Sequence, residues 1–294
     1  MGRILLTGAD GQVGRELQQV LPRLGEVVGV TRAQLDLSQG EQIRQLIQQI
    51  QPDGIINSAA YTAVDRAERE PTLAQAVNAL APTIMAEEAA KIGAFLCHLS
   101  TDYVFNGQKN TPYGETDPTA PLSIYGQTKL AGERGIEQVG DRYLILRTAW
   151  VYGVYGKSNF VKTMLRLGQE REELRVVADQ VGSPTWAGDI ASAIIQLRQT
   201  EATGIYHFTN SGVASWYDFA IAIFEEARSL GFPLKVQRVL PITTADYPTP
   251  ATRPAYSVLS SKKFVETVGN YPPYWRASLR KMIQQLQEIN STPS

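Results

Sequence analysis

The stretch Thr7-Gly8-Ala9-Asp10-Gly11-Gln12-Val13-Gly14 decides the fold, because it sets three glycines at G-x-x-G-x-x-G spacing near the start of the chain. The apolar run Arg3–Thr7 before it predicts a strand, and the periodic run Val13–Leu21 after it predicts a helix. In such a unit the glycines permit a tight turn and close packing, and the helix N-terminus offers N–H groups to a pyrophosphate. The context favours a dinucleotide-binding loop over an ordinary glycine turn, and its glycines are candidate cofactor contacts.

Short apolar runs alternate with helix-like segments over the first half of the chain. Their continuous apolarity indicates strands that are buried on both faces. Such alternation is typical of a Rossmann-like, doubly wound parallel sheet of the α/β class. The predicted strands are Arg3–Thr7, Val27–Thr31, Gly54–Ser58, Phe95–Ser100 and Tyr143–Thr148, and the predicted helices are Val13–Leu21, Gly40–Ile50, Pro71–Ile92 and Pro121–Val139.

The pattern loosens after residue 150, which predicts two parts. Residues 1–150 would form the dinucleotide-binding domain, and 151–294 mainly a smaller, irregular substrate-binding region, from which some segments return to the sheet. The proline-rich stretch Tyr247–Pro254 excludes a helix or a central strand, and Asn290–Ser294 is expected to be a frayed tail. The other elements predicted here are helices Phe160–Glu170, Gly188–Gln199, Ser215–Leu230 and Arg276–Ile289, and strand Gly204–Thr209.

The composition excludes several classes of protein. A chain of 294 residues with 43% hydrophobic and 19% charged residues can bury a sizeable core, so it is neither disordered, collagen-like nor a coiled coil. A formal charge of -1 gives no basic field for nucleic acid or an anionic membrane. The single cysteine, Cys97, excludes a disulfide framework. Because neither a secretory signal nor an apolar stretch of roughly 18 residues is visible, we expect a cytoplasmic protein without membrane or nucleic-acid partners.

The segment Tyr125-Gly126-Gln127-Thr128-Lys129 has the spacing Y-x-x-x-K near the start of the predicted helix Pro121–Val139. Residues four apart share one helical face, so the phenol and the ammonium lie together. We expect the lysine charge to lower the pKa of the phenol from about 10, so that Tyr125 exchanges a proton with a substrate alcohol or carbonyl near neutral pH. Tyr125 and Lys129 are therefore candidate catalytic residues.

Polar residues also follow the predicted strand Phe95–Ser100, where open α/β sheets place their ligands. The Thr101 hydroxyl can donate to the same carbonyl oxygen as Tyr125, which makes Thr101 a third catalytic candidate. The alternative is that Ser100, Thr101 and Asp102 only end a strand. Because Y-x-x-x-K is common by chance, it is the combination of both features that favours a reaction centre.

The end of the second predicted strand bears on the choice of cofactor. An acidic residue there favours NAD, because it binds the ribose 2′-hydroxyl. This chain has Thr31 and Arg32 instead, and a guanidinium suits the 2′-phosphate of NADPH. Arg32 is equally interpreted as a solvated surface residue, so the choice between NADPH and NADH as the cofactor stays open. Asp36 and Leu37, further along, are candidate contacts of the adenine ring, with Asp36 accepting from its amino group.

Further segments carry a resemblance that extends over nearly the whole chain. Together with the glycine loop and the catalytic candidates, they resemble the dTDP-4-dehydrorhamnose reductase family of the extended short-chain dehydrogenase/reductase superfamily. That family more often has alanine at Ser58, and some members have histidine at Tyr61, but neither difference removes a catalytic group. The segments are Asn57–Asp65, Ser100–Phe105, Arg147–Tyr152, Asp179–Thr185 and Tyr247–Pro250.

The resemblance implies a reaction in nucleotide-sugar biosynthesis. In that reaction the 4-keto group of dTDP-4-dehydro-β-L-rhamnose is reduced with NAD(P)H to give dTDP-L-rhamnose. Thr101, Tyr125 and Lys129 would form the catalytic set, with Tyr125 as the proton donor and Lys129 also holding the nicotinamide ribose. Thr101, Asp102 and Trp150 would contact the sugar. The resemblance further implies that Gly11, Gln12 and Val13 cover the pyrophosphate, within the loop from Gly8 to Gly14, and that Ala60, Tyr61 and Thr62 line the cofactor.

Two other functions and two further properties stay open at this point. A nucleotide-sugar epimerase or dehydratase would use the same scaffold, and an epimerase would retain tightly bound NAD. A non-catalytic subunit like the regulatory subunit of methionine adenosyltransferase would need none of the three catalytic candidates. Some family members pair through a magnesium-linked carboxylate interface, in which Glu16 would match one ligand. A homodimer and a need for magnesium therefore stay open, and no other metal site is expected.

The remaining chemistry-bearing residues have structural interpretations. His98 and His207 lie in apolar runs without ligand spacing, which favours satisfied structural histidines over metal or catalytic roles. The position of Trp216 indicates packing at a helix start more than stacking on a substrate. Ser215 and Asp218 resemble a capping box, which supports a helix there. Three weaker candidates could contact the diphosphate of the sugar nucleotide, and each is equally interpreted as an ordinary surface residue: Lys157, Asn159 and Arg253.

Overall fold

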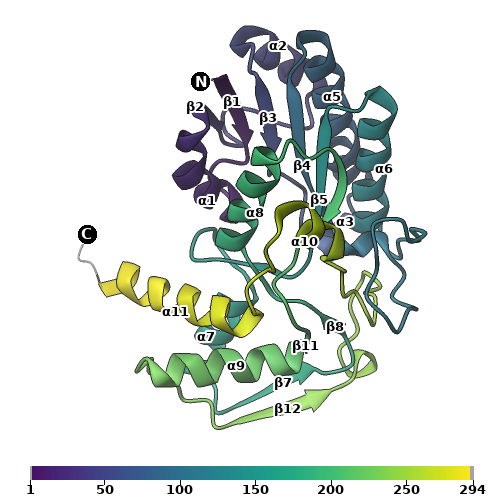
Figure 1. Cartoon of the computed structure of the whole chain (residues 1–294). Coiled ribbons are helices and arrows are strands. Elements are labelled where there is room, and N and C mark those ends of the chain that lie inside the picture. The colour runs from purple at the N-terminus through teal and green to yellow at the C-terminus, as the bar shows by residue number, and fades with distance from the viewer. Residues whose placement is uncertain (1, 292–294) are drawn as a thin grey trace.

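The computed structural model describes residues 2–291 and centres on a six-stranded parallel sheet (Figure 1). Its strands are β1 (Gly2–Thr7), β2 (Gly25–Val30), β3 (Gly54–Asn57), β4 (Phe95–Thr101), β5 (Tyr143–Thr148) and β10 (Gly204–His207). They lie in the order β2–β1–β3–β4–β5–β10, so the winding reverses between β1 and β3. Ligands of doubly wound sheets bind at such a switch point, outside the carboxyl ends of the strands.

Parallel pairing aligns these carboxyl ends along one edge of the sheet. Thr7 lies opposite Asn57, and Asn57 lies opposite His98. One strand further along, Thr101 of β4 lies opposite Thr148 of β5. Residues in register point to the same face, so a polar row crosses β1, β3 and β4 inside the molecule.

Helices cover both faces of the sheet. One layer consists of α1 (Gln12–Val20), α8 (Ala187–Gln199) and α10 (Lys262–Val268), and the other of α2 (Gly40–Ile50), α5 (Ala81–Ile92) and α6 (Ile124–Val139). Neighbouring strand residues point to opposite faces, so Leu6 packs in the core of the first layer and Leu5 in that of the second. Each such buried leucine stabilises the fold by roughly 1.5–3 kcal/mol. The predicted Rossmann-like fold class is confirmed.

Two predicted helices differ from the structure. The predicted helix Pro71–Ile92 consists of α4 (Pro71–Gln75), a π-helical turn (Ala76–Leu80) and α5. The extra residue of a π turn is tolerated here because Asn78 binds the backbone of another segment. Helix α6 begins later than predicted, because Ser123 caps it by accepting a hydrogen bond of 3.2 Å from the Gly126 N–H.

The C-terminal half forms a second layer of structure below the carboxyl edge of the sheet (Figure 1). Its core joins α7 (Phe160–Glu170), α9 (Trp216–Ser229) and α11 (Trp275–Ser291) to the parallel pair β7 (Glu173–Val177) and β12 (Arg238–Ile242). Neither strand of this pair was predicted, because each has only five residues, and none of those in β12 is fully buried. The shorter elements are α3 (Val64–Ala67), β6 (Val151–Tyr152), β8 (Val181–Gly182), β9 (Thr185–Trp186) and β11 (Ala214–Ser215).

The chain returns to the sheet after residue 150, since β10 pairs with β5 and α8 packs on α1. The predicted strand Gly204–Thr209 ends at His207, and the predicted strand Val27–Thr31 ends at Val30. Helix α11 continues through Ser291, so the frayed tail does not begin at residue 290, and residues 292–294 lie outside the described part of the chain. Within residues 2–291, no helix is both long enough and apolar enough to span a membrane.

Candidate active site

The glycine loop joins β1 to α1 in a geometry that only glycines allow. Gly8 has φ of +69°, in the left-handed region, and the Gly11 N–H donates to the Gly8 carbonyl oxygen over 2.9 Å. A Cβ on Gly14 would lie 2.0 Å from that same oxygen. Helix α1 has no side-chain cap at its N-terminus, where Gly11 is extended. Its first N–H groups therefore remain for an anion, which fits the pyrophosphate of a dinucleotide.

A loop from the C-terminal half lies against the glycine loop. Asn159 donates to the Gln12 side-chain oxygen over 2.7 Å and to the Gly153 carbonyl over 2.8 Å, and it also caps α7. A Cβ on Gly156 would lie 2.5 Å from the Gln12 Cγ atom. Asn159 thus positions Gln12, while Lys157 is exposed on the same loop. Asn159 therefore has a structural task, whereas these contacts give Lys157 none.

Four of the predicted cofactor contacts follow β2. The Thr31 backbone N–H and hydroxyl both bind the Gln34 side-chain oxygen, at 2.9 and 3.0 Å. Arg32 is exposed, and Asp36 accepts a hydrogen bond of 2.9 Å from the Ser38 N–H, which lowers the pKa of its carboxyl. Leu37 is buried in the core beside α2. Arg32 and Asp36 therefore remain accessible at the strand end, while Leu37 presents little side-chain surface there.

The backbone after β3 is held in place by a residue that the sequence analysis missed. Asn78 accepts from the Tyr61 N–H over 2.8 Å and donates to the Tyr61 carbonyl over 3.1 Å. The Tyr61 hydroxyl donates to Glu70 over 2.6 Å. Ala60, Tyr61 and Thr62 therefore form a fixed wall beside the switch point. A polar residue on a predicted buried helix face is the signal that would have identified Asn78.

Thr101 and Tyr125 meet where β4 ends and α6 begins. Tyr125 lies in the first turn of α6, and the Tyr103 ring packs edge-on against it at 5.7 Å. Burial raises the pKa of Tyr125 to about 12, although a hydrogen bond with the Thr101 side chain opposes this shift. The phenol therefore keeps its proton at neutral pH, as a proton donor must.

Asp102 lies beside this pair and is 2% exposed. Its Oδ1 atom accepts from the Thr101 hydroxyl over 3.0 Å, while its Oδ2 atom is buried and makes no hydrogen bond within the described residues. Burial raises the pKa of this carboxyl to about 6, although the Ser257 and Thr101 side chains oppose this shift. A buried oxygen without a partner is costly, and a hydroxyl group of a bound ligand would satisfy it.

Lys129 is fully buried behind Tyr125 and does not lower the pKa of that phenol, contrary to our expectation. Its amine faces His98 Nε2 at 3.0 Å and donates to the Leu99 carbonyl over 2.6 Å. Burial lowers the pKa of Lys129 to about 8. In the cofactor-free protein, burial therefore dominates the titration of both residues.

Trp150 has a strained backbone and a side chain that is held by ring stacking. It has φ of +48°, which is uncommon for a residue with a side chain, and its ring stacks on Trp216 at 3.5 Å with 4° between the ring planes. Gly182 leaves room for the indole, because a Cβ there would lie 2.5 Å from it. Trp216 begins α9 behind the predicted capping box of Ser215 and Asp218. Trp216 therefore acts in packing, and it does so by fixing the predicted sugar contact.

The proline-rich stretch reaches the site through Arg253. This guanidinium forms a two-pronged ion pair with Asp65, at 2.7 and 3.0 Å, and binds the Ala251 carbonyl over 3.1 Å. Burial acts to lower the pKa of Arg253, but the ion pair with Asp65 and a hydrogen bond with Tyr103 raise it above its ordinary value. Arg253 therefore ties the C-terminal half to α3 beside the catalytic candidates.

His207, which was predicted to be a structural histidine, is confirmed in that role. The ring of His207 lies 3.0 Å from the Tyr113 carbonyl and 3.4 Å from the Arg147 guanidinium. Burial lowers its pKa to about 3, so it stays uncharged. Arg147 in turn pairs with Glu133 over 2.6 Å inside the protein.

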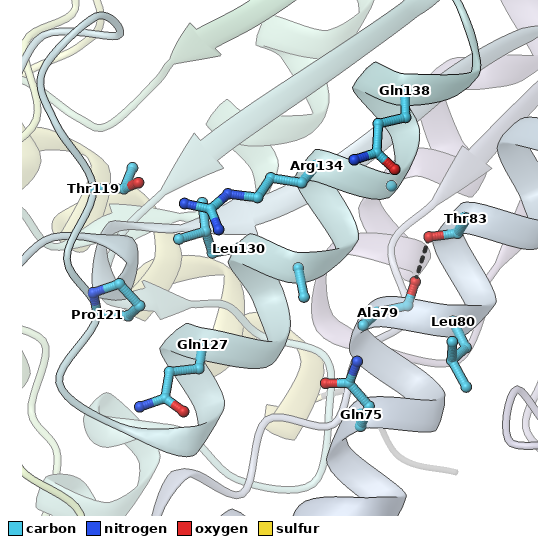
Figure 2. A pocket seen from close by; sticks show the side chains of 12 residues that line it. Gln75, Ala79, Leu80, Thr83, Thr119, Pro121, Gln127, Leu130, Arg134 and Gln138 are labelled. Carbon is cyan, nitrogen blue, oxygen red and sulfur yellow. Dashed lines mark hydrogen bonds between the residues drawn. The ribbon is translucent and has the colours of Figure 1, made fainter.

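A pocket lies away from this arrangement, between α6 and the segment from α4 to α5. Figure 2 shows side chains from these two helical segments around it, among them Gln75, Thr83, Gln127 and Arg134. None of the predicted site residues lines it. The predicted site residues therefore lie at the carboxyl edge of the sheet and not in this groove.

Comparisons with known proteins agree with the geometry. The family model described as RmlD substrate binding domain matches residues 2–288. A dTDP-4-dehydrorhamnose reductase from Burkholderia thailandensis is 44% identical over 97% of this chain and 99% of that protein. Another from Escherichia coli strain K12 is 44% identical over 96% of this chain and 97% of that protein. A crystal structure of dTDP-4-dehydrorhamnose reductase from Bacillus anthracis in complex with NADP matches with a TM-score of 0.91 and 41% identity, over 97% and 99% of the two chains.

Glu16, the candidate metal ligand, lies on α1 facing Asp189 of α8. Burial, and secondly the charge of Asp189, raise the pKa of Glu16 to about 7, and its Oε1 atom has no hydrogen bond within the described residues. Asp189 accepts a hydrogen bond of 2.7 Å from Asn210. Across residues 2–291, no group of three or more His, Cys, Asp or Glu side chains could hold a metal ion. Two carboxylates alone do not make a magnesium site within one chain.

We expect Glu16→Gln to stabilise the protein near pH 8 and to leave it unchanged near pH 4.5. The pKa of Glu16 is about 7 in the folded protein and has the ordinary value of 4.5 in the unfolded chain. Ionisation of Glu16 therefore lowers the stability of the fold as the pH rises from 4.5 to 7, and the full penalty applies above pH 7. Removing the ionisable group would relieve roughly 1–3 kcal/mol at the higher pH. Thermal unfolding at both pH values measures the effect. The exposed Glu172→Gln is the control, and equal melting temperatures of Glu16→Gln and wild type near pH 8 would contradict this expectation.

Proposed function

The chain belongs to the RmlD substrate binding domain family, and we propose that it reduces the 4-keto group of dTDP-4-dehydro-β-L-rhamnose with NADPH to give dTDP-L-rhamnose. The observation that supports this most is the meeting of a protonated Tyr125 with Thr101 at the carboxyl end of β4. The uncapped glycine loop lies at the end of β1 on the same edge of the sheet.

The cofactor has a consistent set of protein groups around its expected position. NADPH, when bound, supplies the hydride for C4 of the sugar. The N-terminus of α1, with Gly11, Gln12 and Val13, would hold the pyrophosphate, because its N–H groups have no side-chain cap. The segment from Ala60 to Thr62 would line the cofactor, and Lys129 would bind the hydroxyls of the nicotinamide ribose.

The protein groups then handle the proton and the sugar. Tyr125 would donate its phenol proton to the O4 oxygen as negative charge develops there, and the Thr101 hydroxyl, turned away from Asp102, would donate to the same oxygen and polarise the carbonyl. Asp102 would accept a hydrogen bond from a sugar hydroxyl through its unpartnered Oδ2 atom. Trp150, supported by Trp216, would pack on the sugar ring.

One assay separates this proposal from its rivals. Purified protein is mixed with NADPH and an enzymatically made dTDP-4-keto-6-deoxy sugar, and the loss of nicotinamide absorbance is followed. An epimerase would instead retain tightly bound NAD and consume no reductant. A regulatory subunit would show no turnover and would capture an enzyme partner in a pull-down.

We further propose that the enzyme acts in the cytoplasm on a free nucleotide sugar, without nucleic-acid or membrane partners. The formal charge of -1 supports the absence of nucleic-acid and membrane partners, because it provides no basic field. Whether the protein forms a homodimer is tested by light scattering. A need for magnesium is tested by the same measurement, and by the absorbance assay, after treatment with a chelator.

We expect Tyr125→Phe to keep the fold and NADPH binding but to lower kcat by about 10²–10⁴-fold. The change deletes only the hydroxyl that donates the proton, while the ring still packs against Tyr103. Steady-state kinetics of the pure variant measure the loss, with thermal unfolding and NADPH titration as controls. A kcat within about threefold of wild type, outside the usual range, would show that Tyr125 is not the acid.

Trp150→Ala should raise KM for the nucleotide sugar by about tenfold and leave the Kd of NADPH unchanged. The indole would contact the sugar but lies on a different segment from the glycine loop. For comparison, Trp216→Ala removes the stacking partner and keeps Trp150 itself, so it should raise KM less than Trp150→Ala does. If Trp150→Ala lowers only the melting temperature, with a normal KM, Trp150 is a packing residue.

Arg32→Ala tests the choice of cofactor. We expect the wild type to prefer NADPH, because the exposed guanidinium can form a charge-assisted pair with the 2′-phosphate worth roughly 1.5–3 kcal/mol. In Arg32→Ala the preference should shrink about tenfold or more, with little change in KM for NADH. Arg23→Ala, at the opposite end of β2, is the matched control. A preference that survives Arg32→Ala, or equal use of both cofactors by the wild type, would make Arg32 a solvated surface charge.

A further inference from the structure

A buried chain of hydrogen bonds runs across the sheet and ends at Lys129. It passes from Thr7 of β1 to Asn57 of β3, then to His98 of β4 and to the amine of Lys129 on α6. All four residues are at most 1% exposed. Because water does not reach these groups, each donor must meet an acceptor within the chain of bonds.

The amide of Asn57 has only one orientation that satisfies its neighbours. Its oxygen accepts from the Thr7 hydroxyl over 2.7 Å and from the Ala59 backbone N–H over 3.2 Å. A backbone N–H is always a donor, so the amide nitrogen must point the other way. That nitrogen lies 3.0 Å from His98 Nδ1 and can only donate. Nδ1 therefore accepts, and the proton of the neutral imidazole lies on Nε2.

The Nε2–H of His98 then points at the amine of Lys129, 3.0 Å away. An ammonium group has three donors and no lone pair, so it cannot accept this hydrogen bond. An uncharged amine can accept it and still donate to the Leu99 carbonyl, which lies at 2.6 Å. We propose that Asn57 and His98 hold Lys129 as an uncharged amine in the cofactor-free protein. His98 is thus a positioning residue. The inference depends on the proposed function only in treating Lys129 as a catalytic residue.

The charges around Lys129 are consistent with this state. Glu133, on the same helix, favours the ammonium form, but its carboxylate is already engaged by Arg147 of β5 and by the Ser100 hydroxyl of β4. Asp102, after β4, faces Tyr125. His98 cannot relieve the contact by becoming charged, because burial and the nearby Lys129 hold its pKa well below the ordinary value. Burial also lowers the pKa of Lys129 to about 8.

The histidine tautomers test this directly, because the chain has only two histidines. His207 is an internal reference, since its Nδ1 must donate to the Tyr113 carbonyl and its Nε2 faces Arg147. Long-range ¹H–¹⁵N spectra of cofactor-free, ¹⁵N-histidine-labelled protein should show one Nδ1–H and one Nε2–H imidazole. Two Nδ1–H imidazoles, or an imidazolium signal from His98 near neutral pH, would overturn the proposal.

The charge of Lys129 is followed by pH titration of the lysine ¹³Cε signals, with Lys129→Arg used for assignment. Burial alone lowers the pKa of Lys129 to about 8, and a hydrogen bond accepted from His98 stabilises only the amine, so we expect a midpoint below 8 in the wild type. A midpoint at or above 8 would overturn the proposal, because Lys129 would then be mainly an ammonium at neutral pH.

Asn57→Asp keeps the acceptor for Thr7 and Ala59 but turns the donor into a second acceptor. His98 should then switch to Nδ1–H and accept from the Lys129 ammonium, which raises the midpoint by about one pH unit or more. His207 should not change, so a switch confined to His98 separates the tautomer effect from the added charge alone. An unchanged tautomer and midpoint in the folded variant would overturn the proposal. If the variant does not fold, the wild-type spectra still decide, and they need neither sugar nor turnover, so they are independent of the proposed reduction.

Discussion

The parallel register of β1, β3 and β4 is the constraint on which the site depends. It sets Thr7, Asn57 and His98 side by side and ends the strands at one edge. Any slip of one residue would turn these side chains to the other face, since strand residues alternate. The same register brings the glycine loop, the wall after β3 and Thr101 to one switch point, where a nucleotide-binding sheet takes its ligands.

Burial then sets the protonation of the groups gathered there. Tyr125 keeps its proton because a phenolate would lose its hydration, and the pKa of Lys129 is lowered for the same reason. Arg147 and Glu133, by contrast, stay buried as an ion pair with a second hydrogen bond from Ser100. Buried groups with shifted pKa values therefore meet at the candidate active site, and the ion pair of Arg147 and Glu133 lies behind them.

The C-terminal half completes the site through a few directed contacts. Asn159 fixes Gln12 of the glycine loop, Arg253 fixes Asp65 of α3, and Trp216 fixes Trp150. Each contact joins residues distant in the chain, and each places a polar or aromatic group beside the carboxyl edge. The strained backbone at Trp150 persists because the stacked ring and Gly182 hold the indole from both sides.

Local patterns in the chain were enough to predict the Rossmann-like sheet, the glycine loop and the Tyr125–Lys129 spacing, because periodicity and turn chemistry act between near neighbours. They could not predict the π turn at Asn78 or the pair of β7 and β12, which depend on partners far along the chain. The expected effect of Lys129 on Tyr125 was wrong, because the spacing of two residues on a helix says nothing of the strand behind them. Only the tertiary structure decides that His98 meets Lys129 there, since burial and hydrogen-bond partners are properties of the packed sheet.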